Sequence, residues 1–297
     1  MATSKMTTQI WAMIFVLAFV WGGSFLFARI AVLEIPPLTL VFLRVAMASM
    51  ALNLFLMIRP SRHQHTLALW RDFAVMGVIN NIIPFGLIFY GQLEIGAGLA
   101  AIINAMTPIW TVVVANFLTV DERFTAQKIV GVMLGFSGVA ILIGMSALDG
   151  LQASTIAQLA VLGATISYAF AGVFGKRFTH IPAVETARGQ LTMSGLLIIP
   201  LMLLIEQPWQ LAMPSQAAIW SVVALAIICT AFAYLLFFEI LSRAGAVNVS
   251  LVTFLIPPSA IVLGMAVLGE QLELFDLIGM AIIMMGLIVI DGRLLKR

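Results

Sequence analysis

Charged residues are scarce in this chain of 297 residues, and their scarcity excludes most kinds of protein. Asp, Glu, Lys and Arg together make up 9% of the sequence, whereas hydrophobic residues make up 62%. Soluble domains contain about 25% charged residues, and a soluble protein this apolar could not cover its own surface. A water-soluble enzyme is therefore excluded. A disordered chain is also excluded, because disorder requires low hydrophobicity.

Cysteine and histidine are nearly absent as well. The single cysteine, Cys229, excludes an intrachain disulfide and a cysteine-based metal cluster. Only three histidines occur, and all of them lie near charged loop residues. The net charge of +2 is too small to indicate nucleic acid, and the sequence has no phosphate-binding motif of the Walker type. We therefore expect no cofactor, no metal and no nucleic-acid partner.

Apolar runs long enough to cross a membrane fill most of the chain. A helix needs about 20 apolar residues to span the hydrocarbon core. Eight runs without charge meet this length, and two more appear when one internal charge is allowed. The ten predicted spans are 6–28, 35–58 (with Arg44), 73–93, 95–120, 129–148, 150–175, 189–205, 207–238, 244–269 and 274–290 (with Asp276). The sequence thus predicts an all-α polytopic membrane protein with a lipid bilayer as its surroundings.

A weak internal repeat divides the chain into two halves, 1–148 and 149–297. At offsets near 148 residues, Glu122, Gly131 and Gly138 recur as Glu270, Gly279 and Gly286, and Gly96, Ala97 and Pro108 recur as Gly245, Ala246 and Pro257. Each half holds five spans, which is an odd number. The second half must therefore enter the membrane in the opposite orientation, as in carriers built from inverted five-helix repeats.

The loop charges agree with this inversion, because cytoplasmic loops carry an excess of Lys and Arg. The loop after the second span contains Arg59, Arg62 and Arg71, whereas its counterpart at 206–216 contains no Lys or Arg. The charges predict a multi-pass protein of the cell inner (plasma) membrane with both termini in the cytoplasm. We expect Glu122 and Glu270, the matched acidic pair, to cap or anchor loops.

Several motifs resemble the tandem repeat of the drug/metabolite transporter superfamily. They are Trp21-Gly22-Gly23-Ser24-Phe25, Pro36-Pro37 with Phe42-Leu43-Arg44, Thr107-Pro108 with Asp121-Glu122, and Pro257-Pro258 with Gly269-Glu270. The resemblance covers essentially the whole chain. It is closest to the EamA type of ten-helix exporter, and within that type to the YddG-like aromatic amino-acid exporters. The second half departs from the pattern, since Tyr168-Ala169-Phe170 stands where the first half has Trp21-Gly22-Gly23.

Candidate substrate-binding residues lie where polar residues and prolines interrupt the spans, because inverted-repeat carriers bind substrate near such interruptions. Asparagine amides both donate and accept hydrogen bonds, which suits a zwitterion, and aromatic rings suit an apolar side chain. Arg44 and Arg188, expected toward the two mouths of the pathway, either attract a carboxylate or tie down helix ends. The full candidate set is Trp21, Arg44, Asn80, Asn81, Pro84, Asn104, Pro108, Tyr168, Arg188, Tyr234, Thr253 and Pro257.

These observations predict an exporter of amino acids, aromatic or neutral, or of related small metabolites, working by alternating access. The first span contains no Asp or Glu, which favours uniport or weak coupling. The same scaffold could instead export nucleobases, nucleosides or amphipathic drugs. An integral-membrane enzyme is a more distant alternative, because no cluster of His or carboxylates lies at membrane depth. Glycine-rich faces on the fifth and tenth spans either pack helices or form a dimer interface, so a monomer and a homodimer both stay open.

Overall fold

The computed structural model describes residues 7–59, 66–119, 124–148, 153–244 and 252–291, and nearly all of these residues are helical. The first half contains α1 (Thr8–Val32), α2 (Pro37–Ile58), α3 (Leu67–Gly77), η1 (Val78–Ile82), α4 (Ile83–Gly91), α5 (Ala97–Asn104), α6 (Thr107–Leu118) and α7 (Ala126–Leu148). The second half contains α8 (Ala153–Phe174), η2 (Gly175–Phe178), α9 (Ala183–Ile205), η3 (Pro208–Gln210), α10 (Gln216–Val223), η4 (Ala224–Phe232), α11 (Ala233–Ala244), α13 (Val252–Leu268) and α14 (Leu274–Asp291).

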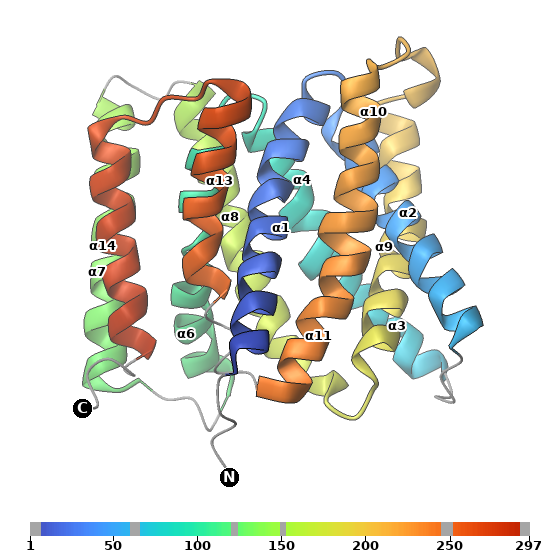
Figure 1. Ribbon diagram of the computed structural model, residues 1–297, viewed down its shortest axis with the longest axis horizontal. Helices are drawn as coiled ribbons and strands as arrows, with labels where there is room; N and C mark the ends of the chain where they lie inside the picture. Colours follow the sequence, from blue (N-terminus) through green and yellow to red (C-terminus); the bar gives the residue numbers. More distant parts are fainter. Residues whose placement is uncertain (1–6, 60–65, 120–123, 149–152, 245–251, 292–297) are drawn as a thin grey trace.

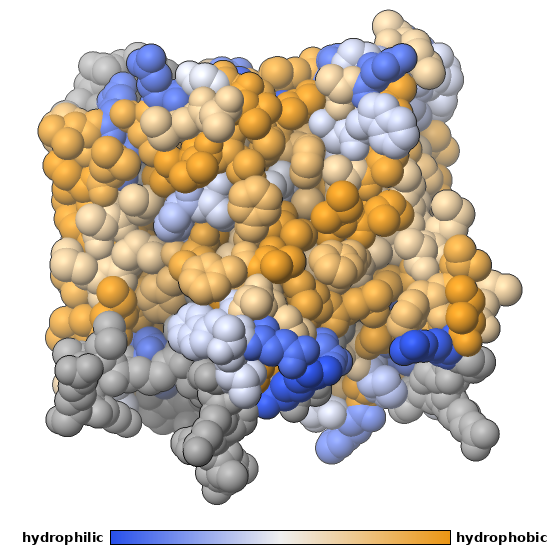
Figure 2. All heavy atoms as spheres, in the orientation of Figure 1, coloured by the Kyte–Doolittle hydropathy of each residue, from blue (hydrophilic) through white to orange (hydrophobic). Residues whose placement is uncertain are grey.

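The helices of this bundle have the length and composition of membrane spans. In the described part of the chain, eight continuous helices are long and apolar enough to cross a membrane, and Ala126–Ile141 and Val252–Leu268 are two shorter apolar helices. Together they coincide with the ten predicted spans, so the predicted all-α polytopic fold is confirmed. Figure 2 shows hydrophobic side chains across the middle of one face, with hydrophilic ones toward both ends.

Local sequence signals explain where several helices begin. Thr7, Thr66 and Ser215 each precede a helix, and each side-chain oxygen accepts a backbone N–H from its first turn. α2 begins at Pro37, where the missing N–H would have no helical partner in any case. α10 begins later than the sequence predicts, because Pro214 disfavours helical backbone at the residue before it.

Helices from both halves share one core. α1 packs against α13 and α10, and α2 packs against α9. α1 begins and α14 ends at the same, lower end of the bundle (Figure 1). The predicted boundary between the halves, at 148/149, borders residues outside the described ranges and stays a prediction.

α7 and α14 lie side by side at one edge of the bundle, where glycines bring their backbones together (Figure 1). A Cβ atom added to Gly131 would lie 2.7 Å from the main-chain oxygen of Gly286, and one added to Gly138 would lie 2.8 Å from that of Gly279. Small residues permit such close approach between membrane helices. The glycine-rich faces thus pack the fifth and tenth spans together within one chain, which leaves them unavailable as the dimer interface considered above.

We expect Gly131→Ala to destabilise the protein by about 1–3 kcal/mol, the usual cost of overpacking. The new methyl group would meet backbone atoms of α14, which can move only if the two helices separate. The thermal unfolding midpoint of the purified protein measures the effect. Gly86→Ala is the matched control, because no atom lies within 4 Å of a Cβ at that position. Equal midpoints for the two variants would contradict this account of the packing.

Candidate functional site

Arg44 lies buried inside the bundle, at the boundary between the two halves. It comes from α2 and is only 7% exposed. Its Nε donates a hydrogen bond of 2.9 Å to the hydroxyl of Thr230 in the second half. Its guanidinium carbon lies 3.8 Å from the ring centroid of Phe85 and 5.9 Å from that of Phe89. Protein groups therefore surround its charged end, and its expected place toward a mouth of the pathway stays a prediction.

Two tyrosines complete the surroundings of this arginine. Tyr168 of α8 and Tyr234 of α11 lie close enough to interact electrostatically with Arg44. Tyr234 also shares a side-chain hydrogen bond with Asn80, whose amide nitrogen donates to Oε1 of Gln190 at 2.9 Å. The structure thus brings four candidate residues together, namely Arg44, Asn80, Tyr168 and Tyr234. We call Arg44, Phe85, Phe89, Tyr168, Thr230 and Tyr234 the Arg44 cluster.

The charge of the Arg44 cluster has no resident counterion among the described residues. The groups that interact electrostatically with Arg44 are Tyr168, Tyr234 and Cys229, and none of them is a carboxylate. Among the described residues, no carboxylate forms an ion pair with Arg44, whereas Arg177, Arg188 and Arg243 each have one. A buried charge is costly unless it is paired. The arrangement therefore suits a ligand that brings its own negative charge.

Both helices that border the cluster contain a π-helical segment. η1 interrupts the third span just before Pro84, and η4 interrupts the eighth span around Thr230. Such segments frequently occur at functional sites. In each segment, a backbone oxygen accepts a hydrogen bond from a hydroxyl group. Ser167 donates to the Ile79 oxygen at 2.7 Å, and Thr230 donates to the Leu225 oxygen at 2.7 Å. The broken helices predicted from Pro84 and from the polar residues of the eighth span therefore take this particular form.

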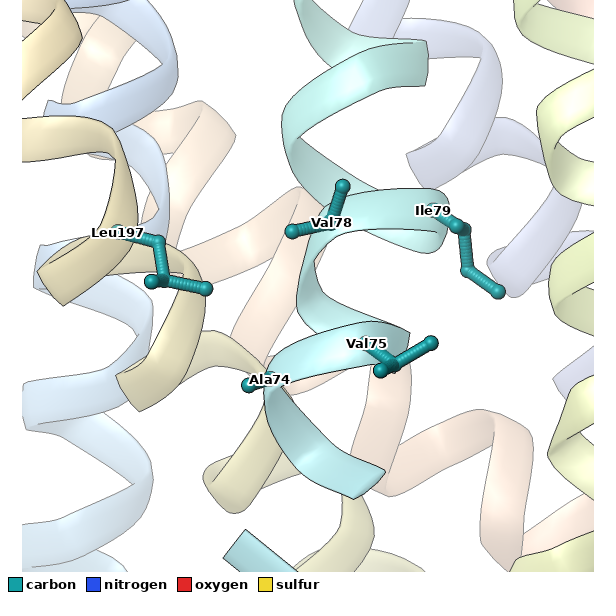
Figure 3. Close-up of a pocket in the computed structure, with 5 residues that line it drawn as sticks. All are labelled: Ala74, Val75, Val78, Ile79 and Leu197. Carbon is teal, nitrogen blue, oxygen red and sulfur yellow. The ribbon is translucent and has the colours of Figure 1, made fainter. Parts of the chain in front are cut away.

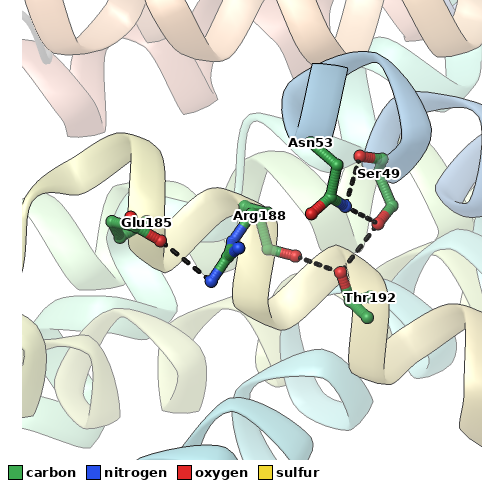
Figure 4. A network of polar contacts seen from close by, with 5 residues as sticks. All are labelled: Ser49, Asn53, Glu185, Arg188 and Thr192. Carbon is green, nitrogen blue, oxygen red and sulfur yellow. Dashed lines mark hydrogen bonds and ion pairs between the residues drawn. The ribbon is translucent and has the colours of Figure 1, made fainter. Parts of the chain in front are cut away.

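Asn81 and Arg188 lie outside the Arg44 cluster. Asn81 is fully buried, and its amide nitrogen donates to the Ser194 hydroxyl of α9 at 2.9 Å. Arg188 forms an ion pair of 3.0 Å with Glu185. Figure 4 shows this pair on α9, beside the hydroxyl contact between Ser49 and Thr192 that joins α9 to α2. The structure thus places both residues in contacts that hold α9.

Glu185 is a buried carboxylate that the sequence analysis missed. It is 3% exposed and lies in the first turn of α9, which begins before the predicted span 189–205. Predicted spans had to be free of charged residues, so this one was predicted to start at residue 189, whereas α9 starts at Ala183. The signal that could have found it is the spacing of Glu185 and Arg188, three residues apart, because such residues face one another on a helix.

The other five candidates are distributed over α1, α5, α6 and α13. The Trp21 ring lies 5.7 Å from the Phe237 ring, and Asn104 ends α5. Pro108 begins α6, while Thr253 and Pro257 belong to α13. Among the described residues, no hydrogen bond or ring contact joins these five to Arg44. Their membership in a binding site stays a prediction.

Two hollows lie away from the cluster. The first is an apolar groove lined by Ala74, Val75, Val78, Ile79 and Leu197, between α9 and the junction of α3 with η1 (Figure 3). All its side chains are aliphatic, so it suits a lipid chain and offers nothing to a polar substrate. The second, of about 370 Å³, lies at the upper end of the bundle beside Arg29, Gly96 and Glu270.

Carboxylates at the upper end hold helix starts across the two halves. Glu206, at the end of α9, accepts hydrogen bonds from the backbone N–H groups of Leu38 (2.8 Å) and Thr39 (2.6 Å) in α2. Glu34 accepts from the backbone and the hydroxyl of Ser215, both at 2.6 Å. These bonds lower the pKa of the exposed Glu34 carboxyl. Their contribution to stability is complete at neutral pH and is lost as the pH falls through that lowered pKa.

Glu270 forms the third link of this kind. Its carboxylate accepts hydrogen bonds from the backbone N–H groups of Ala97 (2.6 Å) and Gly98 (3.0 Å), at the start of α5. These N–H groups have no partner within their own helix. The expectation that Glu270 caps or anchors a loop is confirmed. Its matched residue, Glu122, lies outside the described residues.

The fold and these contacts define a class of protein, namely a multi-pass membrane protein with helices broken near a buried arginine. The model of the EamA-like transporter family matches the chain twice, over residues 9–144 and 155–291. The chain therefore belongs to the EamA-like transporter family, which confirms the resemblance at that level.

Individual relatives agree with this assignment. The chain is 24% identical to the transporter YoaV of Bacillus subtilis, over 90% of this chain and 91% of that one. It is 22% identical to the inner membrane transporter YedA of Escherichia coli K12, over 93% and 89%, and 29% identical to PecM of Dickeya dadantii, over 75% and 74%. A crystal structure with 18% sequence identity superposes with a TM-score of 0.68 and covers 98% of this chain and 99% of that chain.

Proposed function

We propose that this transporter exports amino acids, aromatic or neutral, or related small metabolites across the inner membrane. The observation that carries the proposal is the Arg44 cluster, a buried arginine without a carboxylate partner among the described residues and with aromatic rings around it. A guanidinium binds a carboxylate through paired hydrogen bonds. Aromatic walls add about 0.5–1.5 kcal/mol for each ring contact with an aromatic substrate. We include in this proposal that the chain is of the YddG-like subtype of aromatic amino-acid exporters.

Alternating access is the proposed mechanism, because the cluster is assembled from both halves. α2 and α4 supply Arg44 and Phe85, whereas η4 and α11 supply Thr230 and Tyr234. A rocking motion of one half against the other would separate these groups and open the cluster to one side. One chain supplies both halves, so a monomer suffices for this mechanism. A homodimer would need a surface other than the glycine-rich faces.

The orientation that we propose places both termini in the cytoplasm, because Lys and Arg favour the cytoplasmic side. In Figure 1, α2 ends at the lower end of the bundle, where Arg59 follows it, whereas α1 and α9 end at the upper end, where Glu34 and Glu206 follow them. The relative YedA is named as an inner membrane protein, which agrees with this location. For the energy source we propose uniport or weak coupling. The buried carboxylate that we describe, Glu185, is neutralised by Arg188.

Counterflow into proteoliposomes tests the proposed function. We expect vesicles that contain the protein and are preloaded with unlabelled phenylalanine to take up labelled phenylalanine faster than protein-free vesicles. A panel of labelled nucleosides, assayed in the same way, tests the alternative substrates, which lack a carboxylate for Arg44. Uptake of nucleosides but not of amino acids would reject the proposal. Accumulation only under an imposed pH gradient would reject uniport.

A non-enzymatic role is part of the same proposal. Among the described residues, no three His, Cys, Asp or Glu side chains come together in a way that could hold a metal ion. The buried Arg44 cluster contains no carboxylate, histidine or metal-binding group to act as a base. Release of unmodified substrate in the counterflow assay, checked by chromatography, would support transport, whereas a changed product would indicate an enzyme.

A further inference from the structure

We infer that the Arg44 cluster selects substrates with a net negative charge, namely carboxylic acids with a flat apolar part and no ammonium group, over zwitterionic amino acids. This rests on the proposed function, since it names the substrate class within the amino acids and related metabolites. The preference for anions over zwitterions follows from the net charge of the cluster with the substrate bound.

The first ground is the net charge of the site. Arg44 is the one buried cation among the described residues, and the groups that interact with it are neutral tyrosines and a thiol. A monoanion brings the site to zero net charge. A zwitterion leaves one positive charge uncompensated inside the bundle, where burial of an unpaired charge is disfavoured.

The second ground is the geometry of the guanidinium. Its Nε is already used for Thr230, so the hydroxyl fixes the direction of the planar group. The ring of Phe85, at 3.8 Å from the guanidinium carbon, covers one face of it. No hydrogen bond from the two terminal nitrogens joins them to the described residues. Those nitrogens form the fork that matches the two oxygens of a carboxylate.

The third ground is that two of the three hydroxyl groups in the cluster are already engaged, which leaves few acceptors for an ammonium group. An ammonium has three donors and needs acceptor oxygens or a negative charge beside it. The Thr230 hydroxyl accepts from Arg44 and donates to the Leu225 oxygen. The Tyr234 hydroxyl shares a hydrogen bond with Asn80. An α-ammonium would therefore stand close to a guanidinium of the same sign without a carboxylate to offset it.

A series of compounds with the same aromatic ring tests the inference on the intact protein. The compounds are 3-phenyllactate (an anion), phenylalanine (a zwitterion) and phenylalaninamide (a cation), which differ little in shape. The half-saturating concentration of each labelled compound is measured by counterflow in proteoliposomes, after subtraction of leakage into protein-free vesicles. We expect a value for 3-phenyllactate at least about tenfold below that for phenylalanine, a ratio that corresponds to ~1.4 kcal/mol.

Cys229 provides a second readout that does not depend on vesicles. It is the only cysteine in the sequence, it is 1% exposed, and it interacts electrostatically with Arg44. In detergent, a maleimide should label it only when the bundle opens. We expect 3-phenyllactate to slow the labelling at concentrations about tenfold lower than phenylalanine does, in line with the counterflow ratio.

Variants separate the charge of Arg44 from a structural role. Arg44→Gln should reduce the ratio between 3-phenyllactate and phenylalanine to near one, whereas Arg44→Lys should keep the preference at weaker affinity. The matched control is Arg177→Gln, because Arg177 is exposed and paired with Asp72, and its ratio should equal that of the unchanged protein.

Each outcome on the unchanged protein decides one question. A preference for 3-phenyllactate supports the inference. Equal or tighter binding of phenylalanine or phenylalaninamide overturns the inference and leaves amino-acid export standing. Transport of none of the three compounds overturns both the inference and the proposed export of aromatic substrates.

Discussion

Arg44→Met should slow transport strongly while leaving the protein folded. Hydrogen bonds to charged groups contribute about 1.5–3 kcal/mol each, so loss of a two-pronged contact with a substrate carboxylate should slow counterflow at least ~100-fold. Methionine fills a similar space among Phe85 and Phe89. An unpaired buried charge is costly, so its removal relieves a desolvation penalty. We therefore expect the thermal midpoint to stay constant or to rise.

The same substitution at the other candidate arginine should give the opposite result. Arg188→Met removes the partner of Glu185, whose side chain is 4% exposed. Because Arg188 itself retains some solvent contact, we expect a loss of stability of about 1–3 kcal/mol. Comparison of midpoints and counterflow rates for the two variants tests both assignments. An Arg44→Met protein that transports normally would remove Arg44 from the site, and one that fails to fold would assign it a structural role.

Glu270→Ala should destabilise the protein by about 2–4 kcal/mol, because two backbone N–H groups at the start of α5 lose charged acceptors. The thermal midpoint measures this loss. Glu34→Ala is the matched control, since Glu34 also caps a helix start across the halves but is fully exposed. Because water competes for the bonds of an exposed carboxylate, we expect its midpoint to fall less than that of Glu270→Ala. The hydrogen bonds of Glu270 are partly buried, so equal shifts for the two variants would contradict its stronger contribution.

Gly96 offers a sharper test of the Glu270 contact. A Cβ atom on Gly96 would lie 2.7 Å from the carboxyl carbon of Glu270. Gly96→Ala should therefore destabilise the unchanged protein, but it should have little further effect in the Glu270→Ala background, where the carboxylate is gone. Such non-additivity is expected only for residues in contact. Additive shifts in the thermal midpoint would show that the two residues do not touch.

The sequence allowed the membrane-spanning helices to be predicted, because the bilayer imposes a strict length of apolar chain. The limits of α2 and α14 agree with the predicted spans to within two residues even though Arg44 and Asp276 lie inside them. The start of α9 was missed, because Glu185 and Arg188 neutralise one another within the helix. A rule that counts charges one at a time treats such a pair as a break.

The candidate site was predictable only in part, for a physical reason. Hydropathy identified Arg44, Asn80, Tyr168 and Tyr234 as polar or aromatic interruptions, but it contains no information on which helices pack together. The hydrogen bond from Arg44 Nε to the Thr230 hydroxyl joins residues that are 186 positions apart in the sequence. The partners of Asn81 and Arg188 depend in the same way on tertiary packing. The pairing of α7 with α14 through glycines likewise became visible only in three dimensions.

The two π-helical segments have a mechanical consequence. In each, a backbone oxygen is bound by a hydroxyl, Ser167 on Ile79 and Thr230 on Leu225. A hydroxyl bond of this kind can be exchanged for one to water at small net cost, and sharp bends in helices occur mainly at such interruptions, whereas ordinary helical turns only curve gently. The third and eighth spans are therefore softest at η1 and η4. Thr230 also accepts a hydrogen bond from Arg44. Binding of a ligand by the guanidinium is therefore coupled directly to bending of the eighth span at η4.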